Sequence, residues 1–259
     1  MTNGIHTHHE IWSQPAAWGD ALAVHARAQP QLAPLLAGRH DQVIFTGCGS
    51  TYYLSLAAAA LFQEQTGRSA RAVPAGELLL NPATVLTGGR TLLVAVSRSG
   101  ATTETVRAVE HFRHKARGPV IAITNYGDQP LAGLADVALV IEQGQEESVA
   151  QTRSFASLYV ATTALAVQAA GRADLRHAME KLPALGATLL ERYAAPAREL
   201  GENLALDRFY FLGSGARYGL ACEVNLKMKE MTLTHSEPFH FMEFRHGPKS
   251  MVNAQAAVV

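Results

Sequence analysis

The stretch that most constrains the fold is Val43–Tyr53, which reads VIFTGCGSTYY. Its first residues are β-branched or apolar, a glycine-rich segment follows at once, and an alanine-rich stretch comes next. These patterns predict a buried strand, a tight glycine turn and a helix N-terminus. Free backbone N–H groups and the positive end of the helix dipole would point into the turn, beside the hydroxyls of Ser50 and Thr51. The turn therefore predicts an anion site.

The residues of this turn favour a sugar phosphate over a nucleotide as the anion. A dinucleotide fingerprint needs a third glycine where Tyr52 stands. The phosphate loop of nucleotide hydrolases needs Gly-Lys-Ser or Gly-Lys-Thr, and this turn has neither.

Composition narrows the class of protein and its partners. The chain has 259 residues, of which 48% are hydrophobic and 17% charged, a globular composition. Because 22 Lys and Arg balance 22 Asp and Glu without a long basic run, nucleic acid is not an expected partner. Two cysteines, Cys48 and Cys222, form no disulfide framework, which predicts a cytoplasmic protein.

The N-terminal residues 1–15 read as a polar leader. They contain His6, His8 and His9, which fit a flexible tail better than a metal site. No charged segment followed by an apolar core is present there, and 54–62 is too short to cross a bilayer. We expect neither export nor membrane insertion.

Strand-like and helix-like segments alternate after the glycine turn. Short apolar runs at 70–73, 91–96, 119–124 and 137–141 are separated by helical segments. This alternation predicts an α/β fold with a doubly wound parallel sheet, in which ligands bind at the carboxyl ends of the strands. The run 91–96 ends in a second hydroxyl-rich turn with Ser97, Ser99 and Thr102. Helix capping alone would explain these hydroxyls, but a second such turn at the same sheet edge favours a phosphate site.

The remaining segments of the first part are predicted to be helical. Pro30 and Pro34 interrupt 16–36, which predicts one or two short leading helices. A buried helix is expected at 158–170, and 175–200 reads as an amphipathic linker helix interrupted at Pro183. We therefore divide the chain into a leader 1–15, a first domain 16–200 and a second domain 201–259.

The glycine turn occurs twice. Residues 207–219, DRFYFLGSGARYG, align with 41–53, DQVIFTGCGSTYY, at an offset of 166 residues. A repeat of this length indicates two copies of one domain, and the second copy is too short to be complete. We expect either a gene product on the order of 350 residues or a partner subunit that covers the exposed sheet.

Chemistry-bearing residues gather in the second copy. Glu223, Lys227 and Glu230 share one face of the predicted helix. A solvated stripe would show the same spacing, but a helix that starts at a glycine turn brings them towards the ligand crevice, where carboxylates can move protons. Further on, His240, Glu243 and His246 have a spacing that a single metal ion does not favour. His246, which precedes Gly-Pro, is a candidate acid or base for opening a sugar ring.

These motifs together resemble the sugar isomerase (SIS) domain family, in particular its amino-sugar-phosphate synthases, isomerases and deaminases. The resemblance spans 10–259 and is carried by both glycine turns, the segments SRSGATTET and SVAQTRSF, the helix with Glu223 and Glu230, and FRHGPK at 244–249. It implies tandem SIS domains, the second incomplete here, in a homodimer that needs no cofactor and no metal. It also implies site residues: Ser50, Thr51, Ser97, Ser99 and Thr102 for the phosphate; Cys48, Gly49, Val149, Gln151, Glu223 and Lys227 for the sugar.

The same resemblance implies the catalytic roles. Glu230 would move the proton between C1 and C2, and His246, supplied by the other subunit, would open the ring. Two positions depart from the synthases, since Arg98 stands in place of a glutamine and Gln151 in place of a serine. The expected activity is ketose/aldose isomerisation of a hexose or hexosamine 6-phosphate, with or without ammonia release, and without glutaminase activity. A sugar-phosphate-binding regulator and a deglycase of phosphorylated sugar-amine adducts are the alternatives.

Overall fold

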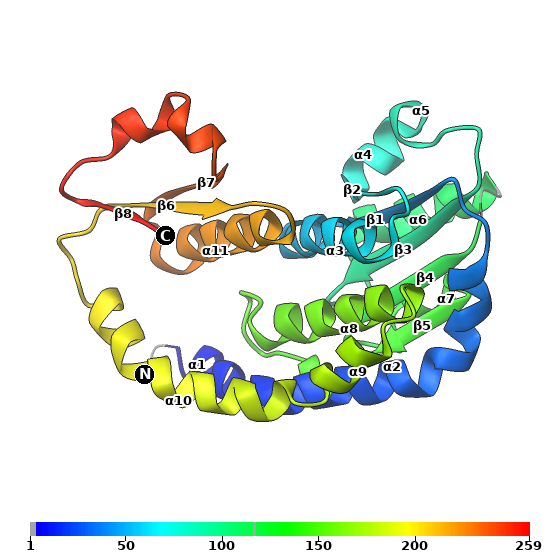
Figure 1. Ribbon diagram of the computed structural model, residues 1–259, viewed down its shortest axis with the longest axis horizontal. Helices are drawn as coiled ribbons and strands as arrows, with labels where there is room; N and C mark the ends of the chain where they lie inside the picture. The colour runs from blue at the N-terminus through cyan, green and yellow to red at the C-terminus, as the bar shows by residue number, and fades with distance from the viewer. Residues whose placement is uncertain (1–3, 116–117) are drawn as a thin grey trace.

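Two parallel sheets, joined through packed helices, make up the protein (Figure 1). The computed structural model describes residues 4–115 and 118–259. Within them, the larger sheet has the strand order β2-β1-β3-β4-β5, and all its strands run parallel. This confirms the predicted doubly wound α/β fold. The strands are β1 (Gln42–Gly47), β2 (Ala70–Pro74), β3 (Thr91–Ser97), β4 (Val120–Thr124) and β5 (Val137–Val140).

The strands of this sheet are apolar throughout because helices cover both of its faces. In β1, Val43 and Phe45 pack into one core and Ile44 into the other, as the alternation of a strand requires. The first core lies under helices α2, α3 and α8, and the second under α4 and α6. These and the short elements between them are α2 (Gln14–Ala37), α3 (Ser50–Thr66), α4 (Ala75–Leu80), α5 (Pro82–Val85), α6 (Thr103–His114), α7 (Pro130–Gly133), η1 (Glu142–Gly144) and α8 (Arg153–Ala169).

Helix α2 corrects the prediction of one or two short leading helices. It is a single helix of 24 residues that runs through Pro30 and Pro34. Both prolines are exposed, so water can hydrogen-bond the carbonyls that they leave unpaired. Leu32 and Leu36 on the opposite side are buried in the core. Burial of each leucine contributes about 2 kcal/mol, which offsets much of the cost of the prolines.

The N-terminal leader also differs from the flexible tail that the sequence predicts. Residues Ile5–Trp12 form helix α1, which includes the three leader histidines. Glu10 of this helix is buried, and its carboxylate accepts the N–H groups of Glu147 and Ser148 at 2.7 and 3.1 Å. The leader is therefore fixed to the first domain through a buried charge.

The second sheet has the order β7-β6-β8 and is also parallel. Its elements are β6 (Arg208–Gly213), α11 (Ala216–Thr232), β7 (His235–His240), η2 (Glu243–Arg245), η3 (Pro248–Met251) and β8 (Ala256–Val258). Strand β7 was not predicted, because its sequence HSEPFH is polar and contains Pro238. The proline is tolerated because β7 lies at the edge of the sheet, where the loss of one N–H donor costs little.

The side chains of β6 alternate between the two faces of the second sheet. Phe209 and Phe211 pack on one face with Ala221 of α11. Tyr210 points to the other face, where its ring lies 5.4 Å from the ring of Phe244. Helix α11 and the segment 243–251 therefore cover opposite faces of this sheet.

Helices α9 (Ala173–Met179) and α10 (Leu182–Gly201) connect the two parts of the chain. Helix α9 ends at Met179 and α10 begins at Leu182 with Pro183 in its first turn, so the predicted helical stretch 175–200 is interrupted next to this proline, as expected. Gly186 packs against the ring of Trp18 in α2, so closely that a Cβ atom there would overlap the indole. Figure 1 shows α2 and α10 running along the bottom of the view beneath both sheets.

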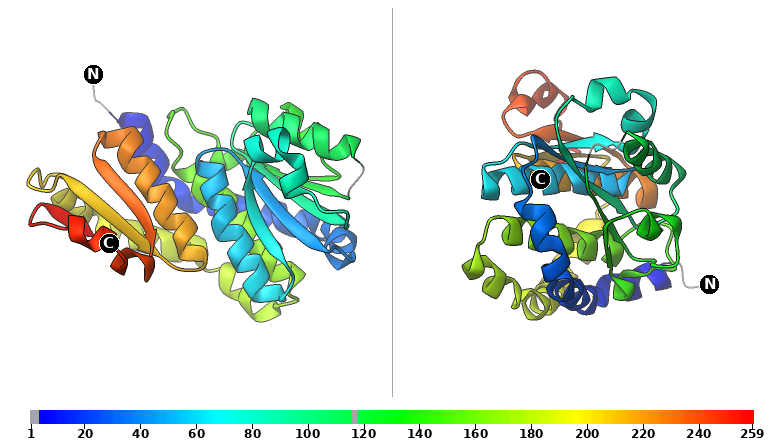
Figure 2. Two further views of the ribbon diagram at one scale, coloured as in Figure 1. Left: turned by 90° about the horizontal axis from the view of Figure 1, so that it is seen from above. Right: turned by 90° about the vertical axis from the view of Figure 1, so that its right-hand side faces the viewer.

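Helices α3 and α11 form the direct contact between the two halves (Figure 2). At Gly219, an added Cβ would lie 2.5 Å from both the Tyr53 carbonyl oxygen and the Ala57 backbone nitrogen. Only glycine permits this approach. Among the described residues, no helix is long and apolar enough to span a membrane.

Candidate active site

The glycine turn between β1 and α3 has a backbone that only glycine adopts readily. Gly49 caps α3 with φ 55° and ψ −124°. A Cβ on Gly47 would lie 2.5 Å from the Thr51 hydroxyl. The sequence thus supplies glycine at both positions where the turn is tightest. The amides of Thr51, Tyr52 and Tyr53 at the start of α3 donate to the carbonyls of Cys48 and Gly49.

The two hydroxyls of this turn have different environments. Thr51 Oγ1 accepts the Cys48 N–H at 3.0 Å and donates to the Cys48 carbonyl at 2.9 Å. Its hydrogen is therefore used inside the turn, and in this geometry Thr51 closes the turn and has no proton to donate to a ligand. Ser50, which is also buried, begins helix α3 and faces the second half of the chain. Ser50 is the hydroxyl of this turn that best fits a ligand.

The second hydroxyl turn follows β3 and precedes α6. Ser97 Oγ lies 3.2 Å from Thr102 Oγ1 and accepts the Gly100 N–H at 3.2 Å, and Ser99 Oγ lies 3.5 Å from Thr102 Oγ1. Strands β1 and β3 are neighbours in register, so both turns end at the same sheet edge. The order β2-β1-β3 makes this edge the point where the winding of the sheet reverses, which is where doubly wound folds bind ligands.

The predicted row of charges on α11 forms as expected. Lys227 Nζ lies 2.5 Å from Glu230 Oε2 and 3.4 Å from Glu223 Oε1. Lys227 is partly buried and Glu230 is exposed, whereas Glu223 is only 5% exposed. One ammonium group thus bridges a buried carboxylate and a carboxylate that is open to solvent.

Glu223 links this row to the glycine turn of the first half. Burial raises the pKa of its carboxyl to about 7, while the Lys227 charge and the Ser50 hydroxyl act in the opposite direction. Ser50 and Glu223 are therefore neighbours, although 173 residues separate them in the sequence. Since α3 and α11 run antiparallel, Lys227 and Glu230 lie successively further beyond the N-terminus of α3.

His246 is not part of this row. It lies between η2 and η3, is exposed, and donates its backbone N–H to the Glu243 carbonyl at 2.9 Å. Because the segment 243–251 and α11 cover opposite faces of the second sheet, the His246 side chain and Glu230 of the same chain are kept apart by that sheet.

Cys48 is turned away from the row. Its Sγ lies 3.5 Å from Thr105 Oγ1 of α6, and burial raises the pKa of its thiol. The side chain thus packs beneath the turn, and a sugar contact at Cys48 or Gly49 would use backbone atoms.

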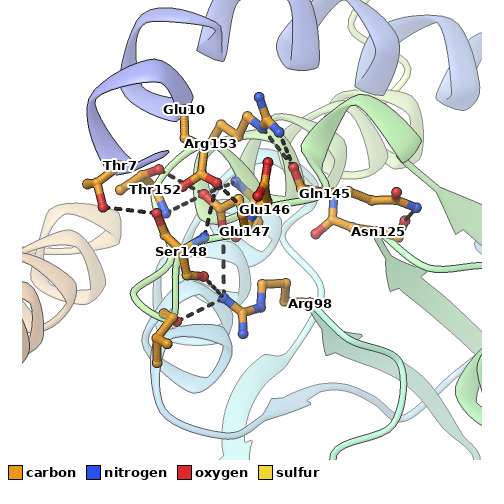
Figure 3. Close-up of polar contacts among 12 residues, drawn as sticks. Thr7, Glu10, Arg98, Asn125, Gln145, Glu146, Glu147, Ser148, Thr152 and Arg153 are labelled. Atoms are coloured by element: carbon orange, nitrogen blue, oxygen red, sulfur yellow. Dashed lines mark hydrogen bonds and ion pairs between the residues drawn. The ribbon is translucent and has the colours of Figure 1, made fainter. Parts of the chain in front are cut away.

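The segment 145–152, which precedes α8, holds Val149 and Gln151, the two other predicted sugar contacts. Val149 is 92% exposed. The backbone around it is held by a polar network that the sequence did not lead us to predict (Figure 3). Glu146, whose side chain is fully buried, accepts the N–H groups of Thr152 and Ser154 at 2.7 and 3.1 Å. The sequence did contain a signal for this cap: Glu146 and Glu147 lie shortly before α8, which begins directly after Thr152.

The described residues contain no group of three His, Cys, Asp or Glu side chains placed to hold a metal ion. His240 stacks on the ring of Tyr218, with ring centroids 3.6 Å apart.

A parallel sheet with hydroxyl-lined turns at its switch point, next to a carboxylate–lysine–carboxylate row, defines an α/β protein with a candidate site for a small anionic ligand. The chain belongs to the SIS domain family, whose sequence model matches residues 35–168. The match lies within the predicted first domain of 16–200, and the domain bounds themselves stay predictions.

Two relatives found by sequence comparison support this membership. The glutamine–fructose-6-phosphate aminotransferase (isomerizing) of Pyrococcus horikoshii is 30% identical over 256 residues, covering 96% of this chain and 42% of the relative. The corresponding protein of Halobacterium salinarum is 33% identical over 229 residues, covering 82% of this chain and 36% of the relative. The chain thus spans less than half the length of these curated relatives.

Solved structures show the same fold. Tagatose-6-phosphate ketose/aldose isomerase from Escherichia coli superposes with a TM-score of 0.88 at 26% identity, covering 98% of this chain and 72% of that one. Glucosamine-6-phosphate deaminase from Thermotoga maritima gives a TM-score of 0.76 at 29% identity, covering 92% and 75%.

Proposed function

We propose that this chain carries the site of a phosphosugar isomerase that interconverts ketose and aldose forms of a hexose or hexosamine 6-phosphate. The observation that carries the proposal is the row Glu223–Lys227–Glu230 beside the Ser50 turn. A phosphate site alone would serve any binding protein. A row of carboxylates next to it also supplies groups that can move a proton.

The phosphate would bind at the N-termini of α3 and α6. The positive ends of their helix dipoles favour an anion, and Ser50, Ser97, Ser99 and Thr102 add hydroxyls. From there an open-chain sugar would extend along α11 towards Lys227 and Glu230. Seven residues separate Glu223 and Glu230, which corresponds to about 10 Å along a helix and suits a six-carbon chain.

Glu230 would act as the base. Its carboxylate takes a proton from the carbon next to the carbonyl, the electron pair of that C–H bond forms the C=C bond of an enediolate, and the proton returns to the other carbon. The Lys227 ammonium, 2.5 Å from Glu230, offers a positive charge near the developing enediolate. Glu223, with a pKa of about 7, can hold or release a proton at neutral pH and so exchange it with a sugar oxygen.

The ring-opening role of His246 would require a second copy of the chain. Within one chain the second sheet separates His246 from Glu230, so a homodimer is needed to bring them together. A mixture of Glu230→Gln and His246→Ala chains tests this. When equal amounts of the two variants are mixed and their subunits exchange, half of the dimers contain one chain of each kind. Each of these dimers has one intact site out of two, so about a quarter of wild-type activity should return. Recovery of no activity would contradict a shared site.

A deaminase is the second candidate, since a structural relative with 29% identity is a glucosamine-6-phosphate deaminase. It would use the same proton transfer on an amino sugar and release ammonia. A regulator that binds without turnover has no need of the charge row, and a deglycase would place a sugar-amine adduct in the same site.

The test is a thermal-shift screen of hexose and hexosamine 6-phosphates, followed by incubation of each binder in D₂O. Isomerisation through an enediolate should incorporate deuterium at C2 and yield the ketose/aldose pair, while ammonia release would identify the deaminase. Binding without deuterium incorporation or product would favour the regulator. A protein that binds none of these compounds would contradict the proposal.

A further inference from the structure

Arg98 lies in the middle of the second hydroxyl turn, directly after Ser97. A cation at this position would be expected to contact the phosphate. Its guanidinium instead extends to the segment 145–152: Nη1 donates to the carbonyls of Ser148 and Val149 at 3.1 and 2.9 Å (Figure 3). The same nitrogen lies 3.8 Å from Glu146 Oε2.

Glu146 fixes the charge that Arg98 meets. Its side chain is fully buried and accepts N–H groups from Thr152 and Ser154 and both of their hydroxyls. A buried carboxylate with this many donors cannot move without losing several charge-assisted hydrogen bonds. Arg98 is thus anchored to a group that is itself anchored to the start of α8.

The same backbone is held from its other side by α1. Glu10 Oε1 accepts the N–H groups of Glu147 and Ser148 at 2.7 and 3.1 Å, and Thr7 Oγ1 lies 2.9 Å from Ser148 Oγ. The N–H groups of Glu147 and Ser148 are therefore bonded to a carboxylate, and the carbonyls of Ser148 and Val149 to a guanidinium. Backbone polar groups in a surface segment would otherwise be free to bond with water.

We propose that Arg98 is a positioning residue that holds the segment 145–152 in place for recognition of the sugar, and that it is not a ligand of the phosphate. This inference rests on the proposed function, because Val149 and Gln151 are sugar contacts only in that reading. Removal of Arg98 would loosen the segment that carries both. The hydroxyls and helix N-termini of the phosphate site would remain.

The KM for the sugar phosphate and the affinity for inorganic phosphate together distinguish a positioning role of Arg98 from a phosphate-binding role. For Arg98→Met we expect the KM for the sugar phosphate to rise about tenfold, which corresponds to 1.4 kcal/mol, with a smaller change in kcat. The affinity for inorganic phosphate, measured as competitive inhibition and by thermal shift, should stay within about twofold. Arg98→Lys should recover most of the loss, because both carbonyl bonds here come from one nitrogen atom. Arg107→Met is the control, since Arg107 is an exposed arginine of α6 that pairs only with Glu110 among the described residues.

Hydrogen exchange of the amides at 146–152 provides the structural measurement. Exchange there should be faster in Arg98→Met and in Glu10→Gln than in the wild type, and unchanged in Arg107→Met. Equal losses of sugar-phosphate and inorganic-phosphate affinity would overturn the inference and make Arg98 a phosphate ligand. Unchanged exchange in Arg98→Met would overturn it as well. If the wild type binds no sugar phosphate, the proposed function fails, and the exchange measurement still decides whether Arg98 holds this segment.

Discussion

The units β1–α3 and β6–α11 share a backbone and differ in their chemistry. Strand and helix bounds in the second unit equal those in the first shifted by 166 residues, and both helices have 17 residues. The capping glycines agree as well, with φ 55° and ψ −124° at Gly49 and φ 57° and ψ −133° at Gly215. Two crevices of the same shape are therefore expected where α3 and α11 pack together.

The side chains make only one of these crevices suitable for the proposed reaction. The first unit supplies the turn hydroxyl of Ser50, where the second has Ala216. The second unit supplies Glu223 and Lys227, where the first has Ala57 and Leu61. Because the helices are antiparallel, Ser50 of the first unit lies next to Glu223 of the second. Under the proposed function, the duplicated backbone gives one composite site, to which each unit contributes a different part.

The largest effect is expected for the two glutamates that occupy the same position in the two helices, Glu230 and Glu64. Glu230→Gln should lower turnover by about 10³-fold while sugar-phosphate affinity stays within about tenfold, because a proton carrier is lost and the binding groups remain. Glu64→Gln should leave both unchanged. Steady-state kinetics and calorimetric binding provide the values. Turnover near wild type in Glu230→Gln would exclude it as the base.

Glu223 should make the stability of the fold depend on pH. The matching position of the first unit is Ala57, which has no ionisable group. The folded-state pKa of Glu223, about 7, lies above the ordinary value of 4.5, so the folded state binds the proton more tightly. This group's contribution is then fully present below pH 4.5, and the free energy of unfolding falls by roughly 3 kcal/mol as the pH rises to 7.

Urea unfolding of wild type and Glu223→Gln at pH 4.5 and 8 tests this. The glutamine variant should gain stability relative to the wild type at the higher pH, while Glu64→Gln, which changes an exposed carboxyl, should show no such gain. A difference that does not vary with pH would contradict the raised pKa.

Alanine substitution at the two capping glycines should affect both units alike. Gly49→Ala and Gly215→Ala should each lower the free energy of unfolding by about 2 kcal/mol, because an L-residue is strained in this conformation. Gly76→Ala in α4 has an ordinary φ and open space around it, and serves as the control. A much smaller loss at Gly215 would show that the two turns do not impose the same strain.

The smallest effect is expected from exchanging the turn residues of the two units. Ser50→Ala should weaken sugar-phosphate binding by about tenfold, since one hydroxyl that bonds a charged group is lost. Ala216→Ser adds the hydroxyl to the other crevice and should not change binding. Titration calorimetry measures both. Equal affinity in Ser50→Ala and the wild type would place the phosphate elsewhere.

Local features of the fold could be predicted because their cause lies within a few neighbouring residues. The apolar run of β1, the glycines of the turn and the alanine-rich helix each have a local physical reason, and the structure confirms all three. Features that depend on distant packing were missed. Helix α2 passes through two prolines because of its buried leucines, and β7 exists because an edge of the second sheet accepts Pro238.

For the site, the residue types that can do chemistry are evident from the sequence: hydroxyls in two turns, a lysine between two glutamates at helical spacing, and a repeat of the strand–turn–helix unit. Which of these residues lie close together depends on how the helices and sheets pack. Close packing at Gly219 brings Glu223 to Ser50 and buries its carboxyl, whereas the second sheet keeps His246 away from Glu230. Burial, and with it the pKa of a carboxyl, depends on every element packed around the group, whereas the spacing of residues along a helix depends only on the helix itself.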